Sequence, residues 1–312
     1  MKKLIFASTL ISILLLNSCI KDKNNSIADP NAKQHNEDVS NVKSESDASN
    51  NEINSYIQGI SVFGKNAQAM ASDICGATYD TTDLHDPIPT LYINFDGTTI
   101  CPGPNRKRSG QVKVELISGT HWSDAGAQLR LTYINYKITF VDLSNHFITF
   151  NGVKTLTDVN GIDWIGVYLG TKTIVVRERC NSMTVTFENG QTSEWLSARI
   201  SEWGYHSSNN EIYATVNGDT TVGGKLLDSW GTTRFGTPFT TEMIAPWKSN
   251  TTCGWWRPTQ GTYKSETTNF TITATFGVNN AGTPISSGCA YGFKLDWTLT
   301  GSSSGNAVIA YW

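Results

Sequence analysis

Short segments in which apolar and polar residues alternate are the feature that most limits the fold of this 312-residue chain. Their period of two is that of a β-strand with one buried and one solvated face. The clearest examples are residues 112–116, 183–187, 270–276 and 291–299. Only residues 53–71 come close to the spacing of a helix, and weakly. The alternation therefore predicts an all-β protein.

Five Asn-Gly or Asp-Gly pairs lie among these segments, and such pairs accept the positive φ angles of tight hairpin turns. We therefore expect an antiparallel body, built as a β-sandwich or an extended meander. Two tandem β units are the alternative, divided near 220–250, where Gly223-Gly224, Pro238 and Pro246 interrupt the pattern. Further strands are predicted at 89–95, 127–140, 146–155, 162–169, 172–179, 192–203, 210–216 and 306–312.

The N-terminus carries a different signal. Lys2 and Lys3 precede an apolar run at residues 4–16 that is too short to span a membrane, and Cys19 follows closely. This arrangement resembles the signal peptide and lipobox of bacterial lipoproteins. The resemblance implies cleavage after residue 18, diacylglycerol on the Cys19 sulfur and an acyl chain on the new amino group. A soluble secreted protein with a chance cysteine is the alternative.

The residues after Cys19 predict where the body is held. Residues 19–55 are rich in Asn, Ser, Asp and Lys, which predicts a disordered tether. A weakly structured lead-in at 56–84 and the β body at 85–312 complete the predicted organisation. Lys21-Asp22 resembles the export signal of surface lipoproteins in Bacteroidota. We expect the outer membrane and its external face, with the periplasmic face as the alternative.

Five cysteines remain after the anchor, and outside the cytoplasm they should be oxidised where geometry allows. We predict disulfides between Cys75 and Cys101 and between Cys253 and Cys289, because each pair flanks one or two predicted strands. Cys180 is then left as a buried thiol. Zinc binding is the competing hypothesis, but no two cysteines have the close spacing of a zinc site.

Charge and motif content exclude some classes of partner. Lys plus Arg number 24 and Asp plus Glu 27, for a formal net charge of −3. This balance offers no basic surplus for phosphates, so we expect no nucleic-acid partner. The sequence has no phosphate loop and no dinucleotide fingerprint, and we predict no cofactor.

Several strand motifs carry a second resemblance. They are LYINFDG at 91–97, Cys101, RKRSGQVKV at 106–114, LTYINY at 131–136, GQTSEW at 190–195 and CGWW at 253–256. This set is similar to a family of all-β lipoproteins of Bacteroidota. The resemblance covers about residues 85–312 and implies the fold and the location, without assigning a catalytic residue. The extra Cys180 and the aromatic C-terminus depart from the family pattern.

The most suggestive candidate site lies on the predicted strand 192–203. If Leu196, Ala198 and Ile200 face the core, Trp195, Arg199 and Trp203 lie on the solvated face. Two indoles and a guanidinium on a flat sheet would form a platform for a sugar ring. The alternatives are contact with a protein, or a second layer that covers this face and makes the tryptophans core.

A short acidic run is the remaining candidate site. Asp83, His85 and Asp86 have the residue types of a metal site, although such a run before Pro87 is more typical of a solvated turn, and we assign no metal.

Taken together, these features predict a lipoprotein anchored in the membrane through Cys19, acting as a non-catalytic binding module for glycan or protein. The alternative is a glycoside hydrolase-like enzyme whose acids are scattered on strand ends, which leaves no catalytic residue to name.

Overall fold

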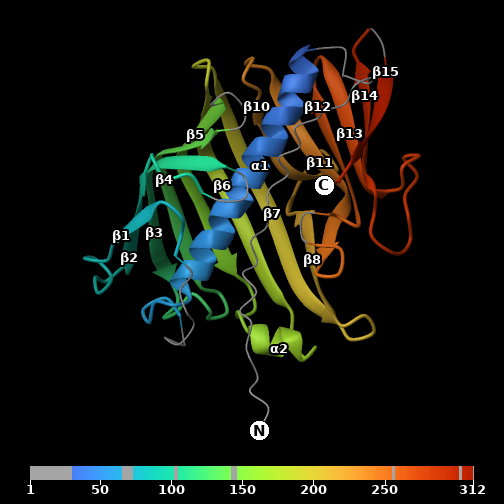
Figure 1. Cartoon of the computed structure of the whole chain (residues 1–312). Helices are drawn as coiled ribbons and strands as arrows, with labels where there is room; N and C mark the ends of the chain where they lie inside the picture. Colours follow the sequence, from blue (N-terminus) through green and yellow to red (C-terminus); the bar gives the residue numbers. More distant parts are fainter. Residues whose placement is uncertain are drawn as a thin grey trace.

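A computed structural model describes residues 30–64, 73–101, 105–141, 146–254, 257–301 and 304–311. The predicted signal peptide, Cys19 and residues 20–29 of the predicted tether lie outside these ranges. The described residues form an all-β body, as predicted, with one long helix laid diagonally across the curved sheet (Figure 1).

All strands pair antiparallel in one continuous sheet. In chain order they are β1 (Ala77–Asp80), β2 (Thr90–Asp96), β3 (Arg106–Ser118), β4 (Gln128–Phe140), β5 (His146–Asp158), β6 (Ile174–Phe187), β7 (Thr192–His206), β8 (Glu211–Gly218), β9 (Thr220–Val222), β10 (Lys225–Thr232), β11 (Pro238–Asn250), β12 (Gln260–Thr267), β13 (Phe270–Val278), β14 (Gly292–Leu299) and β15 (Ser304–Ala310).

The order of the strands is that of an extended meander with one local closure. Neighbours in the sheet follow the chain from β1 to β7 and from β10 to β15. β7 and β11 each pair with both β8 and β10, so these four strands close into a small ring of hydrogen-bonded neighbours. Within residues 220–250, β9 pairs with β10 and β10 pairs with β11. The sheet is therefore continuous across the region where the sequence allows a division into two β units.

Helix α1 (Pro30–Ile57) replaces most of the predicted tether. The prediction of disorder is wrong for residues 30–55, because this polar segment packs on the inner face of the sheet. One stripe of the helix is buried, with spacings of three or four residues: Ala32, His35, Val39, Val42, Glu45, Ser49, Ile53 and Ile57. That is the period of a helix, but polar residues occupy three of its positions. A search for apolar periodicity alone therefore misses the helix.

The main core lies between α1 and the inner face of the sheet. Val39, Val42, Ile53 and Ile57 of the helix join one apolar cluster with residues of β2 to β7. A smaller cluster surrounds Ala32 on β13, β14 and β15. On β13 the predicted alternation is confirmed, since residues 270, 272, 274 and 276 are buried while the intervening threonines are only half-buried.

Three local predictions need correction. Residues 162–169 do not form a strand, because Asp163 caps a short helix, α2 (Trp164–Tyr168), and Gly170 follows it with φ of 69°. Asn151-Gly152 lies inside β5 at an irregularity in its pairing and is not a turn. The β body also begins earlier than residue 85, since β1 lies within the predicted lead-in and pairs with β2.

Candidate functional site

The predicted platform on β7 is not an exposed face. Trp195 is 6% exposed, and its ring centroid lies 5.1 Å from that of Phe239. Arg199 donates to both carboxylate oxygens of Asp47 on α1, at 2.7 and 3.1 Å. The helix covers the face that was assigned to solvent, so the prediction of exposure is wrong for Trp195 and Arg199. Trp203 lies farther along the same strand and is half-buried.

The error has a simple physical cause. Leu196, Ala198 and Ile200 were expected in the core and lie on the opposite face of β7. Ala198 is buried, as predicted, but Leu196 and Ile200 are only half-buried. Both faces of this strand carry large side chains, and a period of two does not say which face is the inner one. The alternative that a second layer covers the tryptophan side is confirmed for the part of the face that holds Trp195 and Arg199.

Ion pairs between α1 and the sheet run along the helix. Lys43 of the helix donates to Asp228 on β10 at 2.6 Å. His35 Nε2 lies 3.1 Å from Ser265 Oγ on β12. Four carboxylates of α1 face arginines of the body: Asp38 with Arg234, Glu45 with Arg106, Asp47 with Arg199 and Glu52 with Arg108. The pairs fix the position of the helix along its length, because each carboxylate has its own partner.

Burial shifts the protonation of several groups in this interface. It raises the pKa of Glu45 to about 7, although Arg106 acts in the opposite direction. It raises the pKa of Asp38 to about 6 against the effect of Arg234. Burial also lowers the pKa of His35 to about 4. The cost of desolvating these charges offsets much of their mutual attraction, so the intact pairs add little net stability, whereas loss of one partner leaves an unpaired buried charge.

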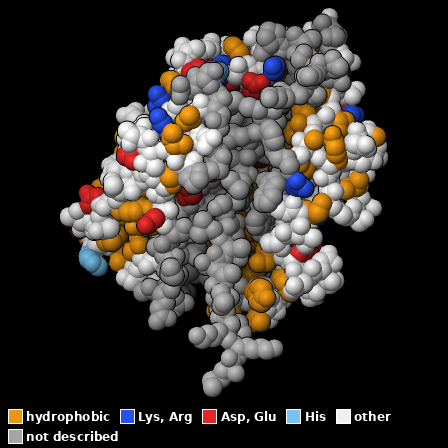
Figure 2. Space-filling view, viewed as in Figure 1, with side chains coloured by type: hydrophobic (Ala, Val, Ile, Leu, Met, Phe, Trp, Pro, Cys, Tyr) orange, Lys and Arg blue, Asp and Glu red, His pale blue; other side chains and the backbone are white. Residues whose placement is uncertain are grey.

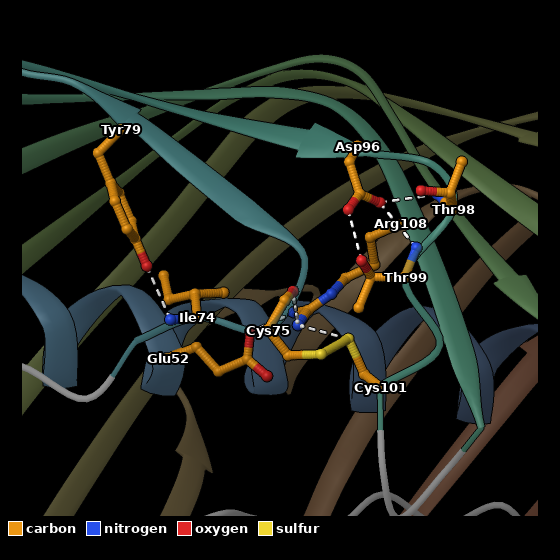
Figure 3. The surroundings of a disulfide bond; sticks show 9 residues. All are labelled: Glu52, Ile74, Cys75, Tyr79, Asp96, Thr98, Thr99, Cys101 and Arg108. Atoms are coloured by element: carbon orange, nitrogen blue, oxygen red, sulfur yellow. Dashed lines mark hydrogen bonds and ion pairs between the residues drawn. A yellow bond between two sulfur atoms is a disulfide. The ribbon is translucent and has the colours of Figure 1, made fainter.

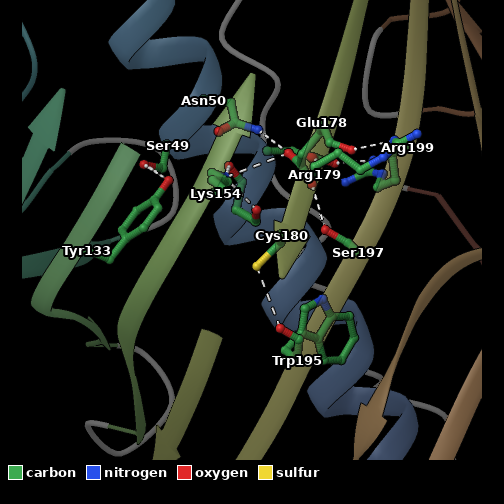
Figure 4. A network of polar contacts seen from close by, with 12 residues as sticks. Ser49, Asn50, Tyr133, Lys154, Glu178, Arg179, Cys180, Trp195, Ser197 and Arg199 are labelled. Atoms are coloured by element: carbon green, nitrogen blue, oxygen red, sulfur yellow. Dashed lines mark hydrogen bonds and ion pairs between the residues drawn. The ribbon is translucent and has the colours of Figure 1, made fainter. Parts of the chain in front are cut away.

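A second polar cluster lies beneath the middle of α1 (Figure 4). Asn50 Nδ2 donates to Glu178 Oε2 at 2.6 Å, and Ser197 Oγ donates to Glu178 Oε1 at 3.0 Å. Lys154 of β5 is fully buried and donates to Ser46 Oγ at 2.8 Å. Its Nζ lies 3.8 Å from Glu178 Oε2. Sequence reasoning did not single out this cluster, because a lysine inside a strand normally marks the solvated side.

The remaining thiol is buried beside this cluster. Cys180 is the free cysteine among the described residues, as predicted. Its Sγ lies 3.6 Å from the carbonyl oxygen of Trp195, and burial raises the pKa of the thiol to about 12. A thiol with so high a pKa holds too little thiolate to act as a nucleophile.

Both predicted disulfides are present. Cys75 bonds to Cys101 with a Cα–Cα distance of 5.8 Å, and Cys253 bonds to Cys289 with 5.2 Å. Figure 3 shows the first bridge beside Arg108, which donates to the Cys75 carbonyl oxygen at 3.0 Å and pairs with Glu52 of α1. The bridge thus lies next to one end of the helix–sheet interface. Its position is structural, since it ties the chain before β1 to the loop after β2.

The acidic run at residues 83–86 does not gather a metal site. Asp83 accepts a hydrogen bond from the Tyr92 hydroxyl at 3.2 Å. Across the described ranges, no group of three or more His, Cys, Asp or Glu side chains is placed to hold a metal ion.

An open hollow of about 520 Å³ lies beside α2. The sequence does not predict this hollow, because the apolar run at residues 162–169 has the character of a strand. Its lining combines an indole, a carboxylate, an ammonium group, amides and small residues. The lining residues are Gln58, Gly64, Ser123, Ala125, Asn160, Gly161, Ile162, Asp163, Trp164, Ile165 and Lys172.

Local structure holds the polar groups of this hollow in place. Asp163 Oδ1 accepts from the Gly166 backbone N–H at 2.9 Å and Oδ2 lies 3.1 Å from Lys172 Nζ. The hydrogen bond from Gly166 and the pairing with Lys172 hold the pKa of Asp163 below its usual range. Asn160 is fixed by bonds to the backbone of Thr173 and Val175, both at 2.8 Å. The Ser123 hydroxyl is buried and has no hydrogen-bond partner.

An exposed apolar surface adjoins the hollow. Ile165, Tyr168 and Leu169 are 72%, 64% and 66% exposed. Hydrophobic side chains gather at the lower end of the molecule in Figure 2, where Figure 1 places α2. The ring of Tyr168 lies 5.8 Å from that of Tyr205 on β7. An indole beside fixed polar groups, rimmed by apolar side chains, has the composition of a site for a small amphipathic ligand such as a sugar.

The chain is an all-β protein in which helix α1 covers the inner face of the curved sheet. The open hollow beside α2 lies at the end of this sheet. No family model, no curated protein and no solved structure matches the chain. Among the helices that the structure describes, none has the length and apolar character to cross a membrane.

Proposed function

We propose that this protein is a lipid-anchored binding module of the outer membrane, facing the cell exterior, and that it binds glycan without catalysis at the hollow beside α2. The observation that carries the ligand class is Trp164 in an open hollow together with Asp163, Asn160 and Lys172. Pyranose rings stack on indoles, and their hydroxyls bond to carboxylate and amide groups.

The composition of the lining supports binding over hydrolysis. Asp163 is the single carboxylate among the described residues that line the hollow, and it is committed to capping α2 and to Lys172. Hydrolysis of a glycosidic bond uses two carboxyl groups on either side of the bond. The hollow therefore supplies contacts for a sugar and lacks the second acid.

The anchor rests on the sequence of the N-terminus. Lys2, Lys3, the apolar run and Cys19 support lipidation, and the strand motifs that resemble lipoproteins of Bacteroidota support the outer membrane. Helix α1 begins at Pro30, so residues 20–29 alone separate Cys19 from the folded body. A chain of that length spans at most about 36 Å. The body would therefore lie close to the lipid surface.

Glycan binding can be tested with neutral hexasaccharides derived from starch, cellulose and xylan, using titration calorimetry. Trp164→Ala should weaken binding of the recognised sugar by about 1–3 kcal/mol, the range for losing an aromatic anchor. Tyr291→Ala removes an exposed aromatic ring outside the hollow and serves as the control. The ligand class is rejected if none of the three sugars binds, or if both variants bind equally well.

A protein ligand is the second candidate, favoured by the exposed apolar rim on α2. In that case Tyr168→Ala and Leu169→Ala would weaken capture of the partner more than Trp164→Ala does.

The lipid anchor has a separate test, in which cells are labelled with a radioactive fatty acid. The wild type should be labelled and Cys19→Ala should not; equal labelling of both, or of neither, refutes the anchor.

A further inference from the structure

Three side chains with complementary chemistry meet under α1. Lys154 comes from β5, Glu178 from β6 and Asn50 from the helix. Glu178 Oε2 lies 2.6 Å from Asn50 Nδ2 and 3.8 Å from Lys154 Nζ, so one carboxylate oxygen contacts both nitrogen-bearing groups. Figure 4 shows Asn50 and Lys154 directed toward Glu178 from opposite sides of the helix–sheet interface.

The surroundings leave little room for water at this meeting point. Lys154 is 2% exposed, and its Nζ lies 5.2 Å from the centroid of the Tyr133 ring. Tyr133, Lys154, Cys180 and Trp195 line a small internal cavity with room for about one water molecule. Asn50 Oδ1 is buried and has no hydrogen-bond partner. An amine, an amide and a carboxyl group are thus enclosed together, and one amide atom lacks a partner.

We propose that Lys154 and Asn50 form an intramolecular isopeptide bond, with Glu178 as the catalytic proton carrier. Glu178 accepts a proton from the Lys154 ammonium group, and the neutral Nζ attacks Asn50 Cγ. Glu178 returns the proton to Asn50 Oδ1 as the tetrahedral intermediate forms. The C–Nδ2 bond then breaks as the carbonyl re-forms: Oδ1 gives its proton back to Glu178, and Nδ2 leaves as ammonia with a proton that came from Nζ. The released ammonia then takes the proton from Glu178 and leaves as ammonium. One C–N bond forms and one breaks, so no oxidant or other reactant is needed.

The pair begins this sequence in its charged state. Burial disfavours both charges, but their mutual attraction, with neighbouring groups, keeps the pKa of Lys154 above its usual range and that of Glu178 below it. Transfer of one proton from Nζ to Oε2 removes two buried charges in a single step. A half-turn of the Asn50 amide then places Oδ1 where Nδ2 now lies, within hydrogen-bond reach of the protonated Glu178. Enclosure in a fixed geometry supplies the effective concentration that an amide needs to react with an amine.

The bond would join α1 covalently to the centre of the sheet. It is independent of the glycan site, since none of its residues lines the hollow beside α2. A helix held by this bond cannot leave the inner face, even in denaturant. The inner face would then be a permanently filled core, and exchange with another ligand would be excluded.

The test is mass spectrometry of the exported, disulfide-bonded protein after full denaturation. The wild type should weigh less than its sequence by one ammonia, after allowance for the anchor and the two disulfides. Trypsin should fail to cleave after Lys154, and residues 138–172 should be recovered joined to residues 44–65. Lys154→Arg and Asn50→Ala should lack the joined peptide. Asn51→Ala changes the neighbouring asparagine and should retain it.

Two results would overturn the proposal. One is a wild-type protein of full sequence mass with both disulfides formed. The other is loss of ammonia with normal cleavage after Lys154, which would indicate a succinimide at an asparagine and no cross-link. Glu178→Gln assigns the proton carrier, because cross-linking should fall at least tenfold in this variant, and an unchanged yield would remove Glu178 from the reaction. Wild-type mapping decides the bond itself even if a variant fails to fold.

Discussion

Removal of Glu45 from α1 should destabilise the protein strongly, because it leaves a buried arginine without its counter-ion. Glu45 and Arg106 lie 2.8 Å apart with side chains only 3% and 5% exposed. Breaking one partner of a buried pair costs about 3–5 kcal/mol. Glu45→Ala should therefore lower the free energy of unfolding by that amount, measured by urea denaturation at about pH 8, where most of this carboxyl is ionised.

The same helix offers a matched control. Lys33 and Glu37 form an exposed pair at 4.0 Å, with side chains 48% and 39% exposed. An exposed pair at this spacing contributes about 0.5 kcal/mol or less. Glu37→Ala should thus have the stability of the wild type, while it removes the same kind of charge from the same element.

A cost of less than about 1 kcal/mol for Glu45→Ala would contradict the assigned burial of this pair, since loss of one partner from a buried pair typically costs about 3–5 kcal/mol. That result would mean that α1 does not lie on the sheet at this point. A double variant separates charge from packing. Glu45→Leu combined with Arg106→Met should recover most of the lost stability, because apolar replacements of a buried pair are often neutral.

Three further predictions concern protonation, packing and covalent links. Burial raises the pKa of Glu45 to about 7 from its ordinary 4.5, so the folded chain binds a proton that the unfolded chain has already lost. Relative to Glu45→Gln, the wild type should lose up to about 3 kcal/mol of stability as the pH rises from about 5 to about 8, and parallel pH profiles would contradict this. Trp195→Ala should destabilise the fold by about 3–5 kcal/mol and the half-buried Trp203→Ala by less than half as much; equal losses in urea titrations would count against the assigned burial. Replacing Cys75 and Cys101 together by alanine opens a link over 26 residues and should lower the unfolding free energy by about 3.5 kcal/mol, and an unchanged denaturation midpoint would argue that the bridge is absent in solution.

The strands and the disulfides could be predicted because their signals are local. The alternation in β3, β6 and β13 arises from one buried and one wetter face, and the structure has strands at these positions. The disulfide pairs followed from the few strands that separate their cysteines. The strand prediction for residues 162–169 was wrong because a short apolar run does not distinguish a strand from a helix. The capping residue Asp163 and the glycine at position 170 were the signals that indicate a helix.

Helix α1 and the choice of inner face on the sheet could not be predicted from local sequence patterns. The helix is polar, and what orders it lies far along the chain, as in the pairing of Asp47 with Arg199 and of Asp38 with Arg234. The orientation of β7 depends on the same helix, so missing α1 also inverted the faces of Trp195 and Arg199. The signal in the sequence was a helical stripe that admits polar residues, combined with the arginines of the β body.

The long reach of α1 sets the order in which the molecule can fold. His35 contacts Ser265, which lies 230 residues later, and Asp38 contacts Arg234, which lies 196 residues later. The first segment of the described body to be synthesised therefore lacks some of its partners until β12 and the strands after it are made. Until then the inner face of the sheet is uncovered, while the waiting helix is too polar to aggregate. A chain that stops before β12 would present that apolar face to the solvent, and we expect it to depend on chaperones that full-length protein no longer needs.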